Sequence, residues 1–387
     1  MTATDIKQLA ADLGFALCGI AEARPSEHAE HVREWIAAGQ HGTMDYLARN
    51  LEPRLDPRHI LEGVRSVICV ADYFGPESPA TGGGREGAVS HENQAPPTGH
   101  VARYAQFDDY HRTIKKRLHR LADALAERAP GERFRACVDT APVLEREHAA
   151  RAGLGWLGKN TLLIHPALGS YMLLGTIVTT LDIAPASPAP PLVPPADHCG
   201  SCTRCIDACP TQCIENPDDT GRRSLDATRC ISYLTIEHRD VIDASLHEAM
   251  GDWVAGCDVC QEVCPFNQRH EGPEARRHEA HPGDPRHVPA MMDPRYAPRE
   301  HLAHGVPLID ILNWTEDDRR AAFKGSAFKR IKLAMLKRNA LIAAGNALRE
   351  RDDDVLRRRI EELAADESEP ALVRETAQQV LRRLHGR

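Results

Sequence analysis

Residues 198–214, "HCGSCTRCIDACPTQCI", determine how the rest of this sequence is interpreted. Four cysteines in this stretch have the spacing C-x2-C-x2-C-x3-C and are followed by a proline, at positions 199, 202, 205 and 209. Residues 256–267, "GCDVCQEVCPFN", look like a second copy that has one cysteine fewer. Such a pair of motifs is typical of ferredoxin-like segments that hold two 4Fe–4S clusters. The sequence therefore predicts two clusters between residues 191 and 270.

The spacing of the motifs also assigns most of the cluster ligands. In a motif of this kind, the first three cysteines surround one cluster, and the cysteine before proline points to the other cluster. The first cluster is therefore expected to have the ligands Cys199, Cys202, Cys205 and, from the second motif, Cys264. The second cluster has Cys209, Cys257 and Cys260, and it lacks one ligand.

Two nearby cysteines could supply the missing ligand, Cys213 and Cys230. Cys213 follows Cys209 closely, in what should be the first turns of a helix, and two ligands from one short segment would compete with the geometry that directs Cys209 across. Cys230 lies between the two motifs and is free to be placed. The spacing favours Cys230 and treats Cys213 as a small packed apolar side chain, but it leaves both open.

Other uses of the cysteines fit the pattern less well. Zinc sites usually pair two C-x2-C knuckles across a long gap, which differs from three cysteines at two-residue spacing. Disulfides would conflict with the cytoplasmic location expected for this chain. Cys18, Cys69 and Cys137 fall in expected helices or strands and are interpreted as structural.

The composition sets limits on where the protein acts. The chain has 387 residues, of which 42% are hydrophobic and 27% charged, and its net charge is −8. A net acidic chain is not expected to grip nucleic acid with its whole surface, although a local basic face remains compatible with it. No apolar run approaches the roughly 18 residues that a membrane span needs, and the N-terminus does not resemble a signal peptide. These features predict a cytoplasmic protein without a membrane segment.

Three segments can be distinguished along the chain, and together they predict a mixed α/β (α+β) fold. Residues 1–190 have β-rich runs at 64–74, 134–140 and 169–181 and a helical run at 111–129, and they include a Gly- and Pro-rich stretch at 75–100 that is expected to be a mobile loop. Residues 191–270 form the cluster segment. Residues 271–387 begin with a linker and continue with three helical stretches of the HEAT type, which need to dock on the rest of the protein to bury their apolar faces.

Two matches to the dinucleotide-binding pattern G-x-G-x-x-G have the wrong context. "GLGWLG" at 153–158 follows a helical run and precedes a strand-like one, which reverses the required order. "GGGREG" at 82–87 lies in the expected loop. The sequence therefore gives no support for NAD binding.

A two-cluster ferredoxin would need far fewer residues than this chain has, so we expect the electrons to be used within the chain. The stretches "VDTAPVLEREHAARAGLGWLGKN", "GSYMLLGTIVTT", "RCISYLTIEHR" and the two cysteine motifs closely resemble the epoxyqueuosine reductases. The resemblance runs nearly from end to end. It implies a cobalamin held between the N-terminal α/β domain and the ferredoxin-like domain. It also implies a substrate, which is the epoxyqueuosine base in the anticodon of a tRNA, and reduction of that base to queuosine.

The resemblance assigns a proton donor and a set of cobalamin contacts. Asp139 in "CVDTAP" matches the family's proton donor, and an apolar pocket would raise its pKa toward the working pH. From the residues alone, Asp139 or Thr140 would be interpreted as a helix cap. The implied contacts with cobalamin are Asp139, Arg54, Lys159, Tyr171, Ser232 and Asp258. The absence of a D-x-H-x-x-G motif agrees with a cobalt whose lower face receives no histidine from that motif.

The expected partners are tRNA and an external electron donor of the flavodoxin or ferredoxin type, and the chain is expected to be a monomer. Residues 319–338 contain eight Lys and Arg and no acidic residue, which favours phosphate contacts. Arg103, Tyr104 and Tyr110 could border the base pocket. Two rival functions remain, a corrinoid reductive dehalogenase and an iron–sulfur electron-transfer subunit. A cobalt assay would separate the second rival from the enzyme.

Overall fold

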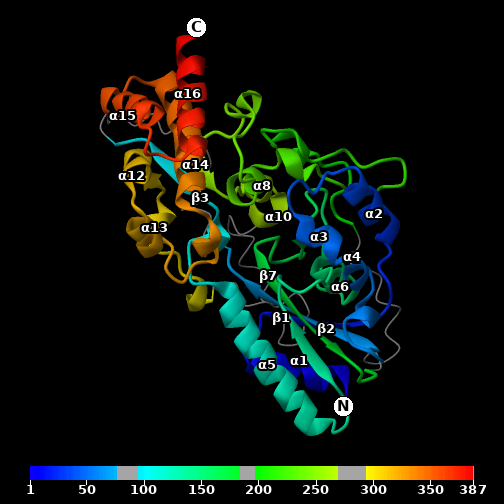
Figure 1. The fold of residues 1–387 in the computed structure, drawn as a ribbon. Coiled ribbons are helices and arrows are strands. Elements are labelled where there is room, and N and C mark those ends of the chain that lie inside the picture. The colour runs from blue at the N-terminus through cyan, green and yellow to red at the C-terminus, as the bar shows by residue number, and fades with distance from the viewer. Residues whose placement is uncertain (76–94, 184–196, 269–292, 387) are drawn as a thin grey trace.

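The N-terminal part of the chain is built on an antiparallel sheet of four strands in the order β1-β2-β7-β4 (Figure 1). The structure is a computed structural model that describes residues 1–75, 95–183, 197–268 and 293–386. The strands of this sheet are β1 (Leu17–Glu22), β2 (Ser66–Tyr73), β4 (Phe134–Cys137) and β7 (Met172–Thr179). The three β-rich runs are therefore confirmed as strands, while β1 was not predicted.

Helices cover both faces of this sheet. Helix α1 (Ala3–Asp12) and helix α5 (Tyr110–Arg128) pack on one face, where Ile68 and Val70 of β2 meet Ile114 and Leu118 of α5. Helix α6 (Glu145–Arg151) packs on the other face, against the alternate β2 residues Val67, Cys69 and Ala71. Since β2 is covered on both faces, all eight of its residues are buried. The predicted helix at 111–129 is confirmed, with its apolar positions 114, 118, 121 and 125 in the core.

Short helices that follow the carboxyl end of β1 form one side of the cavity in which the functional site lies. They are α2 (Ala29–Ala37), α3 (Asp45–Arg49) and α4 (Leu51–Leu55), followed by the 3-10 turn η1 (Pro57–His59). A small hairpin of β5 (Trp156–Leu157) and β6 (Leu163–Ile164) follows α6. Residues 153–158 thus connect a helix to a strand, as the sequence predicted.

The cluster segment contains little regular structure. Its elements are α7 (Arg204–Asp207), η4 (Ala227–Arg229), α8 (Ile231–Ile236), η5 (Ala244–Leu246), β8 (Trp253–Ala255), α9 (Val259–Glu262) and α10 (Pro265–Gln268). Strand β8 pairs in parallel with β3 (Thr98–Val101), which pairs on its other side with β9 (Val306–Pro307). The predicted loop at 75–100 was therefore wrong at its end, because residues 98–100 belong to the strand that joins the three segments; its residues 76–94, with the second glycine motif, lie outside the described residues.

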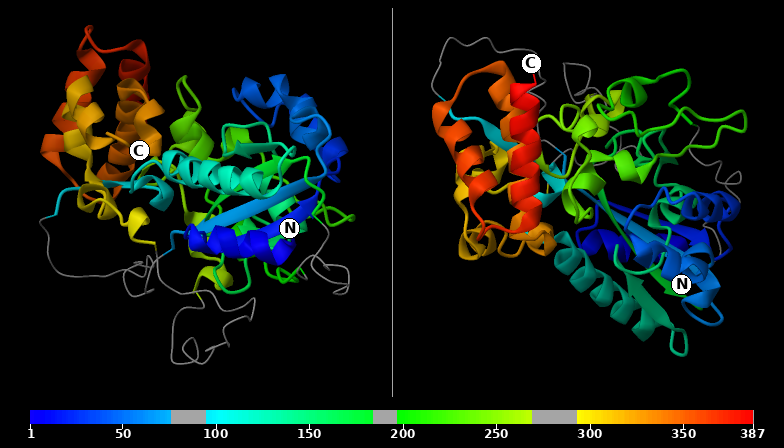
Figure 2. Two further views of the ribbon diagram at one scale, coloured as in Figure 1. Left: turned by 90° about the horizontal axis from the view of Figure 1, so that it is seen from below. Right: turned by 45° about the horizontal axis from the view of Figure 1, so that its top comes forward.

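The C-terminal part is helical and forms a separate lobe beside the cluster segment (Figure 2). Its elements are η7 (Pro294–Tyr296), α11 (Glu300–Ala303), α12 (Leu308–Asn313), α13 (Glu316–Ala322), η8 (Ala327–Arg330), α14 (Leu333–Glu350), α15 (Asp354–Ala365) and α16 (Ala371–His385). Helix α16 packs against α14 and α15, which confirms the three predicted helices. No helix within the described ranges combines the length and apolar character that a membrane span requires.

Helix α14 docks the helical lobe on the cluster segment through two buried polar side chains. Arg338 is fully buried, and it donates hydrogen bonds to the backbone carbonyls of Leu234, His238 and Asp240 at 2.6–2.8 Å. Asn339 donates to the carbonyls of residues 235 and 254. These bonds satisfy backbone carbonyls of α8, of the turn after it and of β8, and those of residues 234, 235 and 254 are buried.

This docking corrects one prediction about the basic stretch 319–338. Arg338 does not face solvent, and Lys337 is also buried, where it pairs with Glu369. Both side chains are therefore unavailable to phosphate groups. Both side chains lie on buried faces of α14. Which faces are buried depends on the parts of the protein that pack against this helix, and the charge pattern of the stretch does not reveal them.

We expect the Arg338→Met variant to lose roughly 3 kcal/mol of unfolding free energy, because one buried and two partly buried carbonyls lose a donor. The measurement is the denaturant midpoint followed by circular dichroism. Arg320→Met is the matched control, since the Arg320 side chain is 66% exposed and forms a surface ion pair with Asp317. Its unfolding free energy should change by no more than about 0.5 kcal/mol. Equal midpoints for the two variants would contradict the docking role of Arg338.

Candidate functional site

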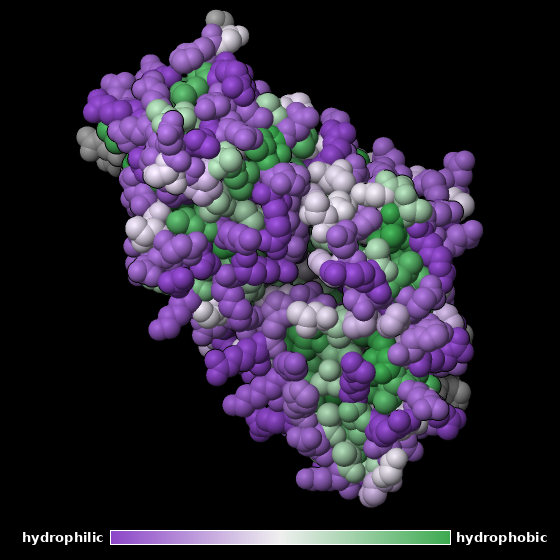
Figure 3. Space-filling view, viewed as in Figure 1, coloured by the Kyte–Doolittle hydropathy of each residue, from purple (hydrophilic) through white to green (hydrophobic). Residues whose placement is uncertain are grey.

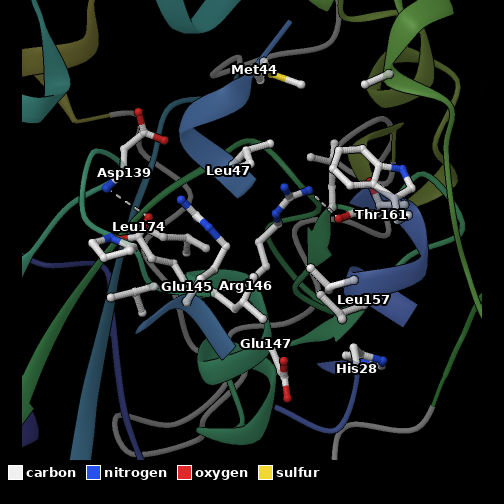
Figure 4. Close-up of a pocket in the computed structure, with 18 of the residues that line it drawn as sticks. His28, Met44, Leu47, Asp139, Glu145, Arg146, Glu147, Leu157, Thr161 and Leu174 are labelled. Carbon is white, nitrogen blue, oxygen red and sulfur yellow. Dashed lines mark hydrogen bonds between the residues drawn. The ribbon is translucent and has the colours of Figure 1, made fainter. Parts of the chain in front are cut away.

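A cavity of about 910 Å³ opens where the sheet, the short helices α2 and α3 and the cluster segment meet (Figure 4). Its wall includes Trp35 and Met44 from the N-terminal helices, Leu173 from β7 and Leu225 from the cluster segment. Hydrophobic side chains are exposed around the hollow on this face of the molecule, while most of the remaining surface is hydrophilic (Figure 3). The cavity thus lies between the segment with the cysteine motifs and the sheet domain.

Asp139 lies on this wall, two residues after the end of β4, in an unusual backbone conformation. Its φ angle is +37°, which is uncommon for a residue other than glycine, although Asp and Asn tolerate this region best. The Asp139 carboxylate is 2.8 Å from Nε2 of His111, and Nδ1 of the same imidazole is 2.7 Å from the Asp109 carboxylate. Lys329 in turn donates to Asp109 at 3.1 Å. The imidazole therefore lies between two carboxylates at the edge of the cavity.

The charges of this group correct the expected pKa of Asp139. Burial alone would raise the pKa of Asp139, as predicted, but the hydrogen bond and the charge of His111 outweigh burial and lower it. For His111, burial opposes protonation, but the hydrogen bonds with Asp139 and Asp109 prevail and raise its pKa. The proton of this pair is consequently held on the imidazole, 28 residues away in sequence from the carboxylate that was expected to hold it.

Glu145 is a second acidic group at the same wall, and sequence analysis did not identify it. Its Oε2 accepts a hydrogen bond from the backbone N–H of Asp139 at 3.1 Å, as the dashed line in Figure 4 shows. Burial, together with the nearby charge of Asp139, raises the pKa of Glu145 to about 8. Its carboxyl group is therefore mostly neutral at pH 7 and can donate a proton.

The side chains predicted to touch a cofactor separate into two groups. Arg54 and Asp139 line the cavity. The other four are not part of its lining. Lys159 donates to the carbonyls of Gly200 and Cys202, and Asp258 accepts from the backbone N–H of Arg103 at 2.6 Å. Tyr171 is buried against Phe74, and Ser232 follows Cys230 at the start of α8.

The cysteines of the first predicted cluster lie together near the surface. Burial, followed by the nearby charges of Cys199 and Cys202, raises the pKa of Cys264. Burial also raises the pKa of Cys205, and the nearby Cys199, Cys264 and Cys202 raise it further. The indole N–H of Trp156, from the sheet domain, donates to Cys199 Sγ at 3.4 Å. The structure thus brings together the four residues that the motif spacing assigned to this cluster.

A second group of thiols lies deeper and includes both open candidates. Cys209, Cys213 and Ile214 form a small buried cluster, against which Cys205, Cys230 and Cys260 pack. Cys257 and Cys230 belong to a core that also contains Trp35 and Met44, two residues of the cavity wall. None of the twelve cysteines forms a disulfide in the structure. Among the described residues, no three metal-binding side chains converge on one point, as a mononuclear zinc site would require.

Two family models match the chain. The description "4Fe-4S double cluster binding domain" applies to residues 198–267, and "Epoxyqueuosine reductase QueG, DUF1730" to residues 54–140. The epoxyqueuosine reductase of Pseudomonas aeruginosa is 36% identical over 346 residues, which cover 89% of this chain and 85% of the relative. The chain belongs to the epoxyqueuosine reductase family. The first of the two family models also confirms the predicted double-cluster domain.

Solved structures of epoxyqueuosine reductases have the same fold. The enzyme from Streptococcus thermophilus aligns with a TM-score of 0.72 at 24% identity, and the alignment covers 98% of both chains. A crystal structure of epoxyqueuosine reductase with an epoxyqueuosine-modified tRNA-Tyr stem loop aligns with a TM-score of 0.77 at 24% identity, covering 98% of this chain and 88% of the other. The mixed α/β fold predicted from the sequence is therefore confirmed.

The cavity fits the cobalamin that membership in the epoxyqueuosine reductase family implies. Its volume is near the upper end of the roughly 300–1,000 Å³ found for ligand pockets. Several polar atoms in its wall are buried and have no hydrogen-bond partner within the described part of the chain: Arg54 Nε, Glu145 Oε1 and Ser224 Oγ. A ligand with peripheral amide groups, such as a corrin, could satisfy atoms of this kind. The apolar side chains of the wall and these unpaired polar atoms together suit a large amphipathic cofactor.

The residues predicted to border the base pocket have different surroundings. Tyr110 lines the cavity and stacks on His111 with ring centroids 4.0 Å apart. Tyr104 is packed edge-on between Tyr110 and Phe328, and Arg103 lies over the ring of Tyr171. From the basic stretch, Arg330 reaches the cavity wall. Contacts of these residues with an epoxyqueuosine tRNA stay predictions.

Proposed function

We propose that this protein reduces epoxyqueuosine to queuosine in the anticodon of a tRNA, with electrons that two 4Fe–4S clusters pass to a cobalamin in the cavity. The observation that carries the proposal is the position of this cavity, whose wall contains residues of the sheet domain and residues next to the second thiol group. A carrier that only transfers electrons has no need of such a cavity or of the acid groups at its edge. Since the substrate is a tRNA, we place this activity in the cytoplasm.

The proposed ligand sets follow the motif spacing and the two thiol groups. The first cluster has Cys199, Cys202, Cys205 and Cys264, and the second has Cys209, Cys230, Cys257 and Cys260. Residues 200 and 201 beside the first set are exposed, so this cluster is suited to receive electrons from an external flavodoxin or ferredoxin. The second set shares its core with residues of the cavity wall, so it is suited to pass electrons onward.

The reaction removes the epoxide oxygen as water and needs two electrons and two protons for each substrate. Reduced cobalamin, when bound, supplies the electrons at low potential. The side chains at the cavity edge supply the protons. His111 holds one proton that Asp139 can deliver to the epoxide oxygen, and neutral Glu145 holds another beside it. Arg146, which crosses the cavity to the carbonyl of Thr161, limits the space in which the base can lie (Figure 4).

The assignment of one proton to His111 and one to Glu145 predicts how turnover depends on pH. The pKa of His111 is raised above its ordinary value of about 6.5, so the imidazole keeps its proton to a higher pH than a free histidine does and loses it as the pH rises through the raised pKa. We expect turnover to fall on this alkaline side. In His111→Asn, the rate at pH 7 should fall roughly 10²-fold, and the alkaline limb should move to lower pH.

The matched control for His111→Asn is His119→Asn, an exposed histidine on the same helix α5, which should leave the profile unchanged. The profile is measured as turnover against pH with reductant and substrate in excess. An alkaline limb that stays at the same pH in the His111 variant would show that this imidazole does not hold the proton, and Glu145 would then be the donor.

The proposed function is tested with anaerobic protein that contains iron, sulfide and cobalamin. This protein is reduced and incubated with tRNA that carries epoxyqueuosine, and the digested nucleosides are identified by mass spectrometry. We expect one oxygen atom to be lost from the base. An electron-transfer subunit would bind no cobalamin and convert no base, and a dehalogenase would act on a small organohalide in place of the tRNA.

A further inference from the structure

Apart from Cys205, which is assigned to the first cluster, the second thiol group contains five cysteines, whereas a 4Fe–4S cluster has four irons for them to bind. We propose that the fifth, Cys213, does not bind iron but donates an S–H hydrogen bond to the Cys209 ligand and thereby adjusts the reduction potential of the second cluster. This inference rests on the ligand sets proposed above. It gives Cys213 a role beyond that of the packed apolar side chain expected from the sequence.

The backbone places Cys213 against Cys209 in a defined way. The segment is not the helix that was expected, because Gln212 has a φ angle of +52° and turns the chain back on itself. The N–H of Gln212 donates to the carbonyl of Cys209 at 3.0 Å. As a result, both the backbone N–H and the Sγ of Cys213 lie 3.4 Å from Cys209 Sγ. The hydroxyl of Thr211 lies 3.8 Å from the same sulfur.

Contacts on the other side hold Cys213 in this position. Its carbonyl accepts a hydrogen bond from the N–H of Asp226 at 2.8 Å, and Ile214 forms a β-bridge with Leu225. The Cys213 side chain also lies close to that of Cys230, so it is placed between two of the proposed ligands. Only 4% of Cys213 is exposed, so its thiol is screened from solvent.

This geometry excludes Cys209 and Cys213 as simultaneous ligands of one cluster. The irons of a cubane occupy separate corners, and the thiolates that bind them point away from one another. Two sulfurs 3.4 Å apart, as here, cannot each bind a separate corner. Since Cys209 precedes proline in the motif, it is the residue of the two that spacing assigns to iron. Cys213 then keeps its hydrogen and can donate it.

A hydrogen bond to a ligand sulfur favours the reduced, more negative state of the cluster and so raises its potential. The effect is strengthened here because the contact is buried, where the local dielectric constant is low. Cys213 should therefore make the second cluster an easier electron acceptor, which suits its position between the first cluster and the cavity. Cys205, a proposed ligand of the first cluster, packs beside the group that contains Cys213, but within the described residues no hydrogen bond joins the two, so the potential of the first cluster should be unaffected.

The test compares Cys213→Ala with Cys213→Ser in anaerobic protein that contains both clusters, by redox titration followed with electron paramagnetic resonance. Alanine removes the donor, whereas serine retains an O–H at the same place. We expect both variants to keep about eight irons per chain. The midpoint of the second cluster should become more negative in the alanine variant and stay closer to that of the natural protein in the serine variant. The midpoint of the first cluster should not move.

Cys69→Ala is the matched control, because Cys69 is a fully buried thiol in β2 away from both motifs. Loss of about half the iron in the Cys213 variants would make Cys213 a ligand and overturn the proposal. A second-cluster midpoint that is unchanged in Cys213→Ala would overturn it as well. Iron content in a Cys230→Ala variant tests the ligand sets separately, so a failure there is distinguishable from a failure of the hydrogen bond.

Discussion

Replacing Asp139 with asparagine should lower turnover of epoxyqueuosine tRNA by ~10²–10⁴-fold, the range that general-acid catalysis contributes. The amide keeps the shape of the carboxylate and can still bond to His111, but it cannot release a proton to the epoxide oxygen. Asparagine is the appropriate substitution because, like aspartate, it tolerates the positive φ of this position. Alanine there would add backbone strain and confuse the result. The measurement is single-turnover conversion with prereduced protein.

Two additional measurements separate catalysis from structure in the Asp139→Asn variant. Iron content should equal that of the natural protein, because Asp139 contributes no ligand to either cluster in the proposed sets, and cobalamin absorbance reports whether the cofactor is still bound. Asp123→Asn, which changes an exposed carboxylate on α5, is the matched control and should leave turnover unchanged. Full turnover of the Asp139 variant would show that another group, with Glu145 as the first candidate, protonates the substrate.

The parts of the fold that were predicted correctly depend on local patterns. Helices α14–α16 and α5 have apolar residues at helical spacing over many turns, and β2 and β7 are long apolar runs. Strand β1, with the sequence LCGIAE, is short and contains a glycine, so its pattern is weak. Strand β3 follows a Gly- and Pro-rich stretch and owes its conformation to pairing with β8 and β9, which are distant in sequence. Tertiary pairing of this kind leaves little local signal.

The functional site also combines features that depend on local sequence with features that depend on tertiary contacts. Cysteine spacing is a local property, and it was sufficient to group the thiols that the structure brings together. The pKa of Asp139 depends on His111, which arrives from the start of α5, and on Asp109 behind it. Burial alone would have given the opposite direction, because the sequence does not reveal which charge faces a carboxylate. Glu145 could have been noticed as the acid six residues after Asp139, but only the structure shows that its carboxyl accepts the Asp139 N–H.

Replacing Cys230 with alanine should remove the second cluster while the first remains, so that iron falls from about eight to about four per chain. Alanine is preferred to serine because a serine oxygen can itself bind iron. Without the second cluster, electrons from an external donor have no path from the surface cluster to the cavity, and turnover should be lost. Iron analysis and the electron paramagnetic resonance signal of the reduced protein provide the measurement.

The control for Cys230→Ala is its neighbour, because Cys213→Ala removes a thiol from the same buried group yet should keep the full iron content. The two variants lose the same side-chain atoms within one hydrophobic core, so a difference in iron between them reports ligation and excludes a general effect on packing. The opposite pattern, with iron lost in Cys213→Ala and retained in Cys230→Ala, would exchange the roles of the two thiols. Retention of both clusters and of turnover in Cys230→Ala would contradict the proposed ligand set, since the fourth ligand of the second cluster would then be a residue other than Cys230.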